Sequence, residues 1–394
     1  MVRTFQRIII APDRHCSSAF LQRLVLYTDL TAYFGAILVG QSAKYLVIGS
    51  LEPYSGKSAA MIGVADRLKA KGLDLAYGKP VSGGSGGSEE VDEDVAFIAK
   101  TLQLGPDRIL PTVVNLGDFE VFRKRLEQID QTDYLDALRQ SAIHQAGDLV
   151  ILEGAGNLED GRLFGLSLLQ VVQAVDASVL MVVRYHSPQV LDGLLAAKAR
   201  LGDRLIGVIL NDVPLKHQAF LESQIQPFLE SMKIQVFGIL PSSNLLRSVT
   251  VEELVQQLKA EVLCRNDRLD LLVESLVIGA MNVNSALRYF QQRHNMAVVT
   301  GGDRQDLQLA ALETSTQCLI LTGHIPPTAE ILRRAEEVEI PILSVDLDTL
   351  TTVGIVEKAF NQVRLHEPVK VHCVKEMYEE HLRVDRLLGA LGLG

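Results

Sequence analysis

Three consecutive residues, Gly56, Lys57 and Ser58, are the part of this sequence whose types and order best suit phosphate chemistry. At the start of a helix, main-chain N–H groups face an anion and stabilise it. The lysine supplies a positive charge for the β- and γ-phosphates of a nucleotide, and the serine hydroxyl can bind Mg²⁺. We therefore expect ATP or a related purine nucleotide and Mg²⁺ as cofactors, with Ser55 as a further contact in the same loop.

The segments on either side indicate whether these residues form a phosphate-binding loop. Residues 45–48 are a short apolar run typical of a buried strand, and apolar side chains recur at helical spacing from Met61 to Leu68. Gly72 follows as a helix-ending glycine. This order of strand, loop and helix favours a nucleotide site. The common pattern has a glycine where this sequence has Leu51, so the alternative is a helix that begins with these residues by chance.

Polar residues also follow several later apolar runs. Glu153 ends the run 148–152, and Lys79 and Asn211 follow two others. Because ligands of parallel sheets bind at the carboxyl ends of the strands, these side chains could meet at one edge with the loop. A carboxylate at such a strand end is a candidate Mg²⁺ ligand, and the alternative is an ordinary turn. The acidic run 89–94 could supply another ligand or form a solvated surface.

Apolar runs alternate with helical patterns over most of the chain, which predicts an α/β fold. The first unit is expected to be a parallel sheet with helices on both faces, and the second a smaller α/β domain. Further strands are expected at 73–78, 178–183, 205–210 and 235–240 in the first unit and at 276–281, 296–300, 318–322 and 340–345 in the second. The expected boundaries are 1–42 for an N-terminal extension, 43–264 and 265–368 for the two domains, and 369–394 for a helical tail.

Three segments have more than one interpretation. Residues 1–42 lack the continuous apolar core of a signal peptide, so we interpret them as a loosely attached extension or as the result of a start codon placed too early. The alternative is an amphipathic arm that packs on a partner subunit. The glycine-serine run 82–88 is either a linker or a mobile lid. The charged helical pattern 374–391 is expected to pack on its own domain or on a dimer mate.

Composition excludes several classes of protein. A net charge of −10 over 394 residues argues against a general nucleic-acid binder. The four cysteines are scattered along the sequence, so neither a zinc site nor a disulfide framework is indicated, and reduced thiols in the cytoplasm are expected. No run reaches the about 18 apolar residues of a membrane span.

The sequence resembles a known two-domain arrangement. Residues 45–70, 79–80, 150–157 and 207–211 resemble dethiobiotin synthetase and the amide-forming synthetases of corrin biosynthesis. They are more similar to the dethiobiotin-synthetase-like N-terminal module of long bacterial phosphotransacetylases. Residues 276–365 resemble the DRTGG domain that follows this module, with 302–304 and 319–324 as the two better-kept stretches.

The resemblance implies roles for individual residues. Ser58, Asp94 and Glu153 would hold Mg²⁺, with Asp92 as the alternative to Asp94. Lys79, together with Lys57, would act on the reacting phosphate or carbamate.

Two further roles concern ligand binding. Asn211 would contact the purine. A second small ligand could bind in the DRTGG domain near Gly302, Asp303, Arg304 and Thr322. Residues that would recognise diaminopelargonic acid have no match, so that substrate is not supported.

Three functions follow from this combination. The first is a nucleotide-binding regulatory protein with weak or no turnover, which signals through its DRTGG domain to a protein partner. The second is an ATP-dependent carboxylate ligase, and the third is an interaction protein with a vestigial nucleotide site. We also expect a homo-oligomer. Because only about 30 residues follow the DRTGG-like segment, too few for the acetyl-transferring domain of the family, phosphotransacetylase activity is not expected.

Overall fold

The computed structural model describes residues 44–83, 92–143, 145, 147–279, 282–363 and 365–394. The expectations for residues 1–42 and for most of the run 82–88 fall outside these ranges. Residues from Ala43 to Gly394 form one compact unit, which contains two main sheets, each with its own core.

The first sheet has seven strands in the order β4-β2-β6-β1-β7-β8-β9, and every neighbouring pair is parallel. The strands are β1 Lys44–Ser50, β2 Leu75–Gly78, β4 Ile109–Leu110, β6 Leu149–Glu153, β7 Ser178–Arg184, β8 Leu205–Val213 and β9 Gln235–Pro241. In β1, Val47 contributes to the core on one face, and Leu46 and Ile48 contribute to the core on the other. Helices on both faces therefore explain why the central strands are continuous apolar runs.

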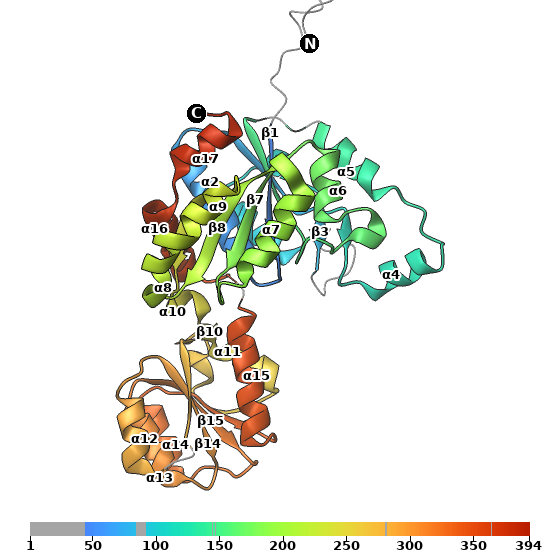
Figure 1. Ribbon diagram of the computed structural model, residues 1–394. Coiled ribbons are helices and arrows are strands. Elements are labelled where there is room, and N and C mark those ends of the chain that lie inside the picture. Colours follow the sequence, from blue (N-terminus) through green and yellow to red (C-terminus); the bar gives the residue numbers. More distant parts are fainter. Residues whose placement is uncertain (1–43, 84–91, 144, 146, 280–281, 364) are drawn as a thin grey trace, which may run out of the picture. The chain divides into compact units, whose positions relative to one another are not determined.

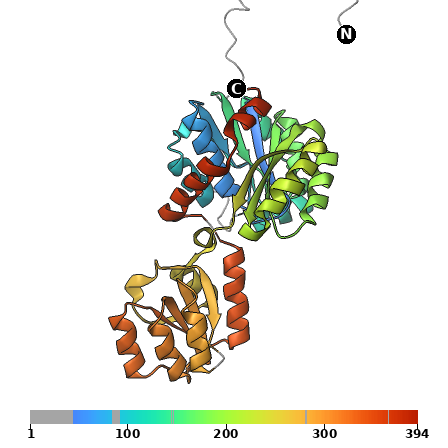
Figure 2. The same ribbon diagram turned by 60° about the vertical axis from the view of Figure 1, so that its left-hand side comes forward.

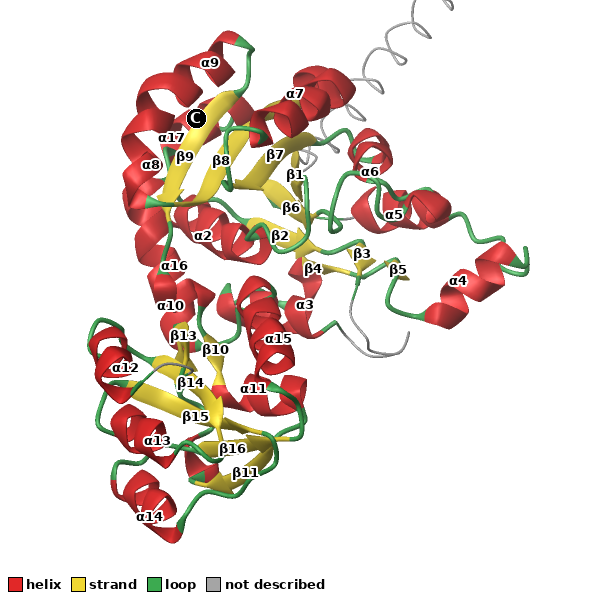
Figure 3. Ribbon diagram, turned by 60° about the horizontal axis from the view of Figure 1, so that its bottom comes forward, coloured by secondary structure: helices red, strands yellow, loops and turns green. Residues whose placement is uncertain are grey.

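Each face of this sheet has its own helices (Figure 3). One core includes side chains of α5 Tyr134–Ile143, α6 Leu168–Ala174, α7 Val190–Leu201, the π-helical turn Leu221–Ile225, which continues α8 Leu215–Phe220, and α9 Gln226–Ser231. The other core includes side chains of α2 Lys57–Ala70 and α3 Glu93–Thr101. This part of the chain also contains β3 Val81–Ser82, which pairs with β5 Val114–Asn115, and the helices α4 Phe119–Leu126 and α10 Asn244–Arg247. The expected parallel sheet with two helical layers is confirmed.

The last two helices, α16 Pro368–His381 and α17 Val384–Leu391, pack on the α2 face of the first sheet (Figure 2). The Tyr378 ring lies against Gly63 of α2, where an added Cβ would be 2.2 Å from the ring. Lys44, in the first strand, donates hydrogen bonds to the carbonyl oxygens of Leu391 and Gly392. The tail therefore completes the core of the first domain, although the DRTGG-like segment lies between the tail and the rest of that domain in sequence.

The second sheet has the order β11-β16-β15-β14-β13, in which only the β11–β16 pair is antiparallel. Its strands are β11 Glu261–Cys264, β13 Ser275–Ile278, β14 Met296–Gly301, β15 Thr316–Thr322 and β16 Ile342–Val345. Helices α12 Val283–Phe290, α13 Gln305–Leu312 and α14 Ala329–Glu337 pack on one face, and α11 Val251–Leu258 and α15 Thr349–Asn361 pack on the other. A short pair, β10 Val249–Thr250 with β12 Leu272–Val273, adjoins it.

The structure differs from the expected boundary at residue 264. Helix α11 and strand β11 lie within the range 43–264, but α11 buries Val251, Leu254 and Leu258 in the second core, and β11 pairs with β16. A capping box of Thr250 and Glu253 starts α11, so the change of domain coincides with a helix start. No helix among the described residues is long and apolar enough to cross a membrane.

Candidate functional site

The phosphate-binding loop, residues 51–56, connects the carboxyl end of β1 to the start of α2. Gly56 has φ +94°, and a Cβ at this position would lie 2.2 Å from Nδ2 of Asn211. That amide donates a hydrogen bond of 2.9 Å to the carbonyl oxygen of Ser55. Asn211, which the resemblance assigned to the purine, therefore holds the main chain of the loop from the end of β8.

Lys57 is almost fully buried under this loop. Its Nζ donates to Oγ of Ser50 over 2.8 Å and to the carbonyl oxygen of Gly156 over 3.4 Å. Burial lowers the pKa of Lys57, and the nearby Glu153 carboxylate opposes this shift. An anion at the loop would offset the same desolvation, so the site favours a phosphate as a further partner of the ammonium group.

Ser58 and Glu153 are brought together as expected. The Ser58 hydroxyl donates to Oε1 of Glu153 over 3.2 Å, and the Tyr77 hydroxyl donates to Oε2 over 3.1 Å. Burial raises the pKa of the Glu153 carboxyl, while the ammonium groups of Lys79 and Lys57 act in the opposite direction. A serine hydroxyl beside a carboxylate is the oxygen donor set that Mg²⁺ takes up with phosphate oxygens and water.

Lys79, just past the end of β2, lies between two carboxylates. Its Nζ is 2.8 Å from Oδ2 of Asp94 and 3.0 Å from Oδ2 of Asp92. Burial by itself would lower the pKa of Lys79, but Glu153, Asp94 and Asp92 together raise it. The Lys79 charge is thus already balanced by acidic groups.

The two candidate aspartates have different surroundings. Asp92 caps α3 by accepting from the main-chain N–H groups of Asp94 and Val95, and it also accepts from the Ser82 hydroxyl. Asp94 lies in the first turn of the same helix, and its Oδ2 contacts Nζ of Lys79 over 2.8 Å. Both aspartates line the cavity, and Asp92 also caps the helix, so the choice of Asp94 over Asp92 as a metal ligand stays a prediction.

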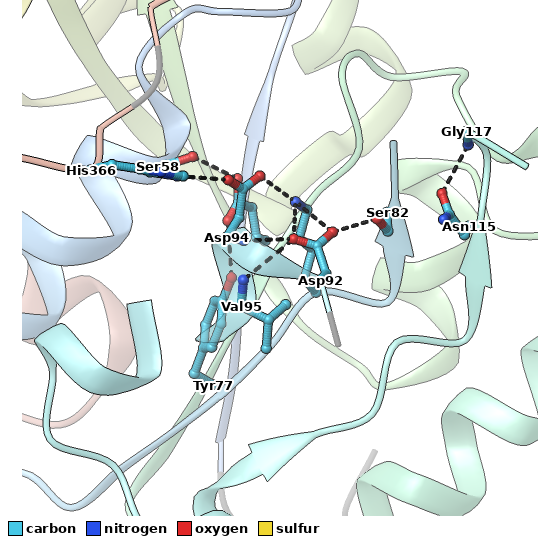
Figure 4. Close-up of polar contacts among 11 residues, drawn as sticks. Ser58, Tyr77, Ser82, Asp92, Asp94, Val95, Asn115, Gly117 and His366 are labelled. Atoms are coloured by element: carbon cyan, nitrogen blue, oxygen red, sulfur yellow. Dashed lines mark hydrogen bonds and ion pairs between the residues drawn. The ribbon is translucent and has the colours of Figure 1, made fainter. Parts of the chain in front are cut away.

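A histidine that the sequence did not indicate also contacts Asp94. Nε2 of His366 lies 3.5 Å from Oδ1 of Asp94 (Figure 4). The imidazole also stacks on the Phe97 ring with a centroid distance of 5.0 Å. His366 lies between α15 and α16, far from the site in sequence. No local pattern marks it, because its relevance depends on the tail returning to the first domain.

A charged cluster lies next to Asn211 at the ends of β7 and β8. Asp212 accepts from Nε of Arg184 over 2.7 Å and from Nε of Arg247 over 2.9 Å. These residues and the phosphate-binding loop line one cavity of about 1030 Å³, which also extends past Lys79 to β3 and β5. No local sequence pattern marks this cluster, since its three members come from different elements.

The oxygen donors of this site would hold Mg²⁺ only together with the phosphate oxygens of a bound ligand. No group of three or more His, Cys, Asp or Glu side chains in the described ranges is arranged to hold a metal ion. Ser58 and Glu153 would supply hard oxygen donors, with Asp94 as the nearby third, and Mg²⁺ characteristically completes its shell with phosphate oxygens and water. The ion would neutralise phosphate charge beside Lys57.

The residues considered for a second ligand lie at the ends of β14 and β15 in the second domain. The buried Thr322 hydroxyl is 2.9 Å from that of Thr349. Gly302 is packed against the main chain of Ile325, where a Cβ would be 2.2 Å from the carbonyl oxygen. Arg304 pairs with Asp306 over 3.3 Å. These contacts stabilise the turn itself, and a ligand near Gly302, Asp303, Arg304 and Thr322 stays a prediction.

Comparison with known families agrees with this division of the chain. A family model described as an AAA domain matches residues 44–250, just over half of the chain. The chain belongs to this AAA domain family. A second model, the DRTGG domain, matches residues 253–359. The resemblance to a phosphate-binding-loop module followed by a DRTGG domain is confirmed.

Relatives of this AAA-domain chain include phosphate acetyltransferases. This chain is 25% identical over 363 residues to the phosphate acetyltransferase of Nitratidesulfovibrio vulgaris. The match covers 87% of this chain and 51% of the relative. The chain is 23% identical over 368 residues to that of Synechocystis sp., with 88% and 51% covered. The chain thus spans about half the length of the curated relatives it matches.

Among solved structures, the CBS and DRTGG domains of the regulatory region of Clostridium perfringens pyrophosphatase, complexed with the activator diadenosine tetraphosphate, share 17% identity with this chain. They cover 41% of this chain and 77% of that one, with a TM-score of 0.27. A similarity this low carries no structural argument.

Proposed function

We propose that this chain binds a purine nucleotide, ATP foremost, together with Mg²⁺ at the phosphate-binding loop, and that it acts as a regulatory protein with little turnover. The arrangement of Lys57, Ser58 and Glu153 carries the proposal. The hydroxyl and the carboxylate are 3.2 Å apart, and the ammonium group lies under the adjacent loop. A Mg²⁺–triphosphate satisfies all three, because its oxygens bind the lysine while the ion binds the other two.

The polar cluster beside the loop supports a nucleotide over a simple phosphate. Asn211, Asp212 and Arg247 line the same cavity as the loop, and they offer hydrogen-bond donors and acceptors of the kind that a purine or ribose requires. Because Arg184 and Arg247 hold Asp212 in place, this part of the cavity is organised before a ligand arrives.

Low turnover is proposed because the catalytic lysine of the related synthetases has acidic partners here. Lys79 lies within 3.0 Å of both Asp92 and Asp94. A cation that is balanced by two carboxylates offers less stabilisation to a charged transition state than an unbalanced one. Binding with slow hydrolysis suits a regulator, and the DRTGG domain or a protein partner would receive the signal.

The test is nucleotide binding by isothermal titration, with ATP, GTP and ADP in the presence and absence of Mg²⁺. We expect Lys57→Met to lose ATP binding at least tenfold, since the variant keeps the buried aliphatic stem but removes the charge. Lys71→Met, at the exposed end of the same helix, is the matched control. If the folded wild-type protein bound no nucleotide at millimolar concentration, the vestigial interpretation would replace this proposal.

A carboxylate ligase is the second candidate, because the cavity continues past Lys79 toward β3 and β5. Ser82 and Asn115 line that extension and leave room for an acceptor beside the phosphates. The discriminating measurement is ADP release with a panel of mono- and dicarboxylates. Acceptor-dependent turnover that is fast relative to the basal rate would favour the ligase over the regulator.

A further inference from the structure

The segment that leads from α15 into α16 contacts the acidic side of the nucleotide site. His366, in this segment, touches Asp94 through Nε2 and stacks on Phe97, which lies one helical turn after Asp94 in α3. The histidine is thus held on two sides by the helix that carries the candidate metal ligand.

The segment is anchored on its far side by a buried lysine. Lys370 has no exposed surface, and its Nζ donates to the carbonyl oxygen of Ser248 over 2.9 Å and pairs with Glu367 over 2.8 Å. Ser248 lies just before the chain enters the second domain. One ammonium group therefore joins the two places where the chain passes between the domains.

The following helix fixes the same segment to the helix of the phosphate-binding loop. Tyr378 packs on Gly63, and Lys375 pairs with Asp66 over 2.8 Å, so α16 is held along α2. Because Ser58 lies in the first turn of α2, residues 366–378 contact both helices that carry candidate Mg²⁺ ligands. The contacts of this segment with α2 and α3 therefore fix the position of His366.

We infer that His366 is a positioning residue for the Mg²⁺–nucleotide site. Its imidazole lies against Oδ1 of Asp94 and so fixes the orientation of this carboxylate beside the metal site, while Oδ2 stays paired with Lys79. The inference rests on the proposed nucleotide binding and gives it a route of regulation. A displacement of the segment after α15 would move His366 and thereby change the affinity for the Mg²⁺ complex.

The experiment compares nucleotide affinity with Mg²⁺ and with EDTA in the full chain. For His366→Ala, we expect the Mg²⁺-dependent gain in ATP affinity to fall about tenfold, as outer partners of metal ligands typically contribute this much or more. Affinity in EDTA should stay within about twofold, because His366 does not touch the nucleotide in this scheme. A purely structural role would instead lower both affinities together.

Two further variants complete the test. His366→Gln keeps an N–H donor at similar reach and should restore most of the gain. His372→Ala removes an exposed histidine of α16 that pairs only with Glu376 among the ion pairs of the described chain, and should behave as wild type. If His366→Ala kept the full gain while wild type showed it, the inference would be overturned and the proposed function would stand. If wild type bound no nucleotide, both would fail.

Discussion

At the scale of single residues, the site depends on buried groups that are hydrogen-bonded within the protein before any ligand arrives. Glu153 accepts from Ser58 and Tyr77, and Lys57 donates to Ser50 under the loop. Such networks are stable only when every buried member has a partner. When a nucleotide binds with Mg²⁺, phosphate oxygens and the metal would replace these internal partners. The same residues would therefore have partners both with and without a ligand.

Gly56→Ala is the first prediction at this scale. The residue has φ +94°, and the added Cβ would meet the Asn211 amide that holds the loop, so this amide or the loop must shift and nucleotide binding should weaken. Gly72→Ala is the control, because φ is +90° there but nothing lies within 4 Å of the new Cβ. The control should cost about 1 kcal/mol, the left-handed conformation alone, in urea denaturation. Equal costs for the two variants would contradict the close contact with Asn211.

At the scale of elements, the helix of the phosphate-binding loop is shaped by its neighbour at the end of the chain. Gly63 lies in the interior of α2, where alanine is normally favoured, yet the Tyr378 ring occupies the space that a Cβ would need. The glycine is thus explained by the approach of α16 and not by the helix itself.

Gly63→Ala should therefore destabilise the protein by about 1–3 kcal/mol, as overpacking of a core does. The matched control is Gly354→Ala in α15, where nothing lies within 4 Å of the new Cβ and the helix should gain up to about 1 kcal/mol. Both are measured by urea denaturation. Stabilisation by both substitutions would mean that α16 does not pack on α2 in solution.

The pairing of the tail with α9 gives a prediction on pH. Arg386 lies 2.7 Å from Glu230, and this hydrogen bond lowers the pKa of the Glu230 carboxyl. A lowered pKa in the folded state stabilises the fold above the usual glutamate pKa of 4.5, and this stabilisation is lost as the pH falls through the lowered value. At pH 7, the free energy of unfolding of Glu230→Gln should be lower than that of wild type by less than about 1 kcal/mol. This difference should shrink below about pH 4.5. A difference that grew on acidification would reverse the sign of this argument.

At the scale of the whole molecule, the first domain is discontinuous in sequence. Its core includes Val374, Tyr378, Leu387, Leu388 and Leu391 from the tail. Each such side chain contributes about 1.5–3 kcal/mol on burial, which together compares with the about 5–15 kcal/mol that stabilises a typical protein. The DRTGG domain is thus inserted between parts of one core.

Deletion of residues 365–394 should leave the first domain unfolded or aggregated, as circular dichroism and size-exclusion chromatography would show. Replacement of residues 251–363 by a short flexible linker should leave it folded. The Lys370–Ser248 contact places the two points of entry close together, so a short linker can connect them. A stable, monomeric deletion variant would contradict the role of the tail in the core.

If the chain is a regulator, nucleotide binding should also change hydrogen exchange in the second domain. With ATP and Mg²⁺ bound, we expect hydrogen exchange to slow at residues 49–58 and to change at 301–304 or 321–324. Coupling of about 1–3 kcal/mol is typical between linked sites. Lys57→Met should abolish both effects. Changes confined to the first domain would argue against regulation through the DRTGG domain.

The sequence by itself determined the α/β fold, the strand–loop–helix at Lys57 and the strand-end carboxylate Glu153. These depend on local patterns: apolar runs mark buried parallel strands, and the carboxyl ends of such strands must share one edge. The pairing of Ser58 with Glu153 needed the strand order as well, because β1 and β6, about 100 residues apart in sequence, are neighbours only in the folded sheet.

Only the tertiary structure decided where the tail packs, which group supports Asp94, and that Asn211 holds the loop. Asn211 and Ser55 are 156 residues apart, and His366 is further still from Asp94 in sequence. No periodicity encodes such contacts, because the buried side of a helix such as α16 could cover any exposed apolar surface. The free energy of covering the α2 face selects the partner, and that choice brings His366 to the nucleotide site.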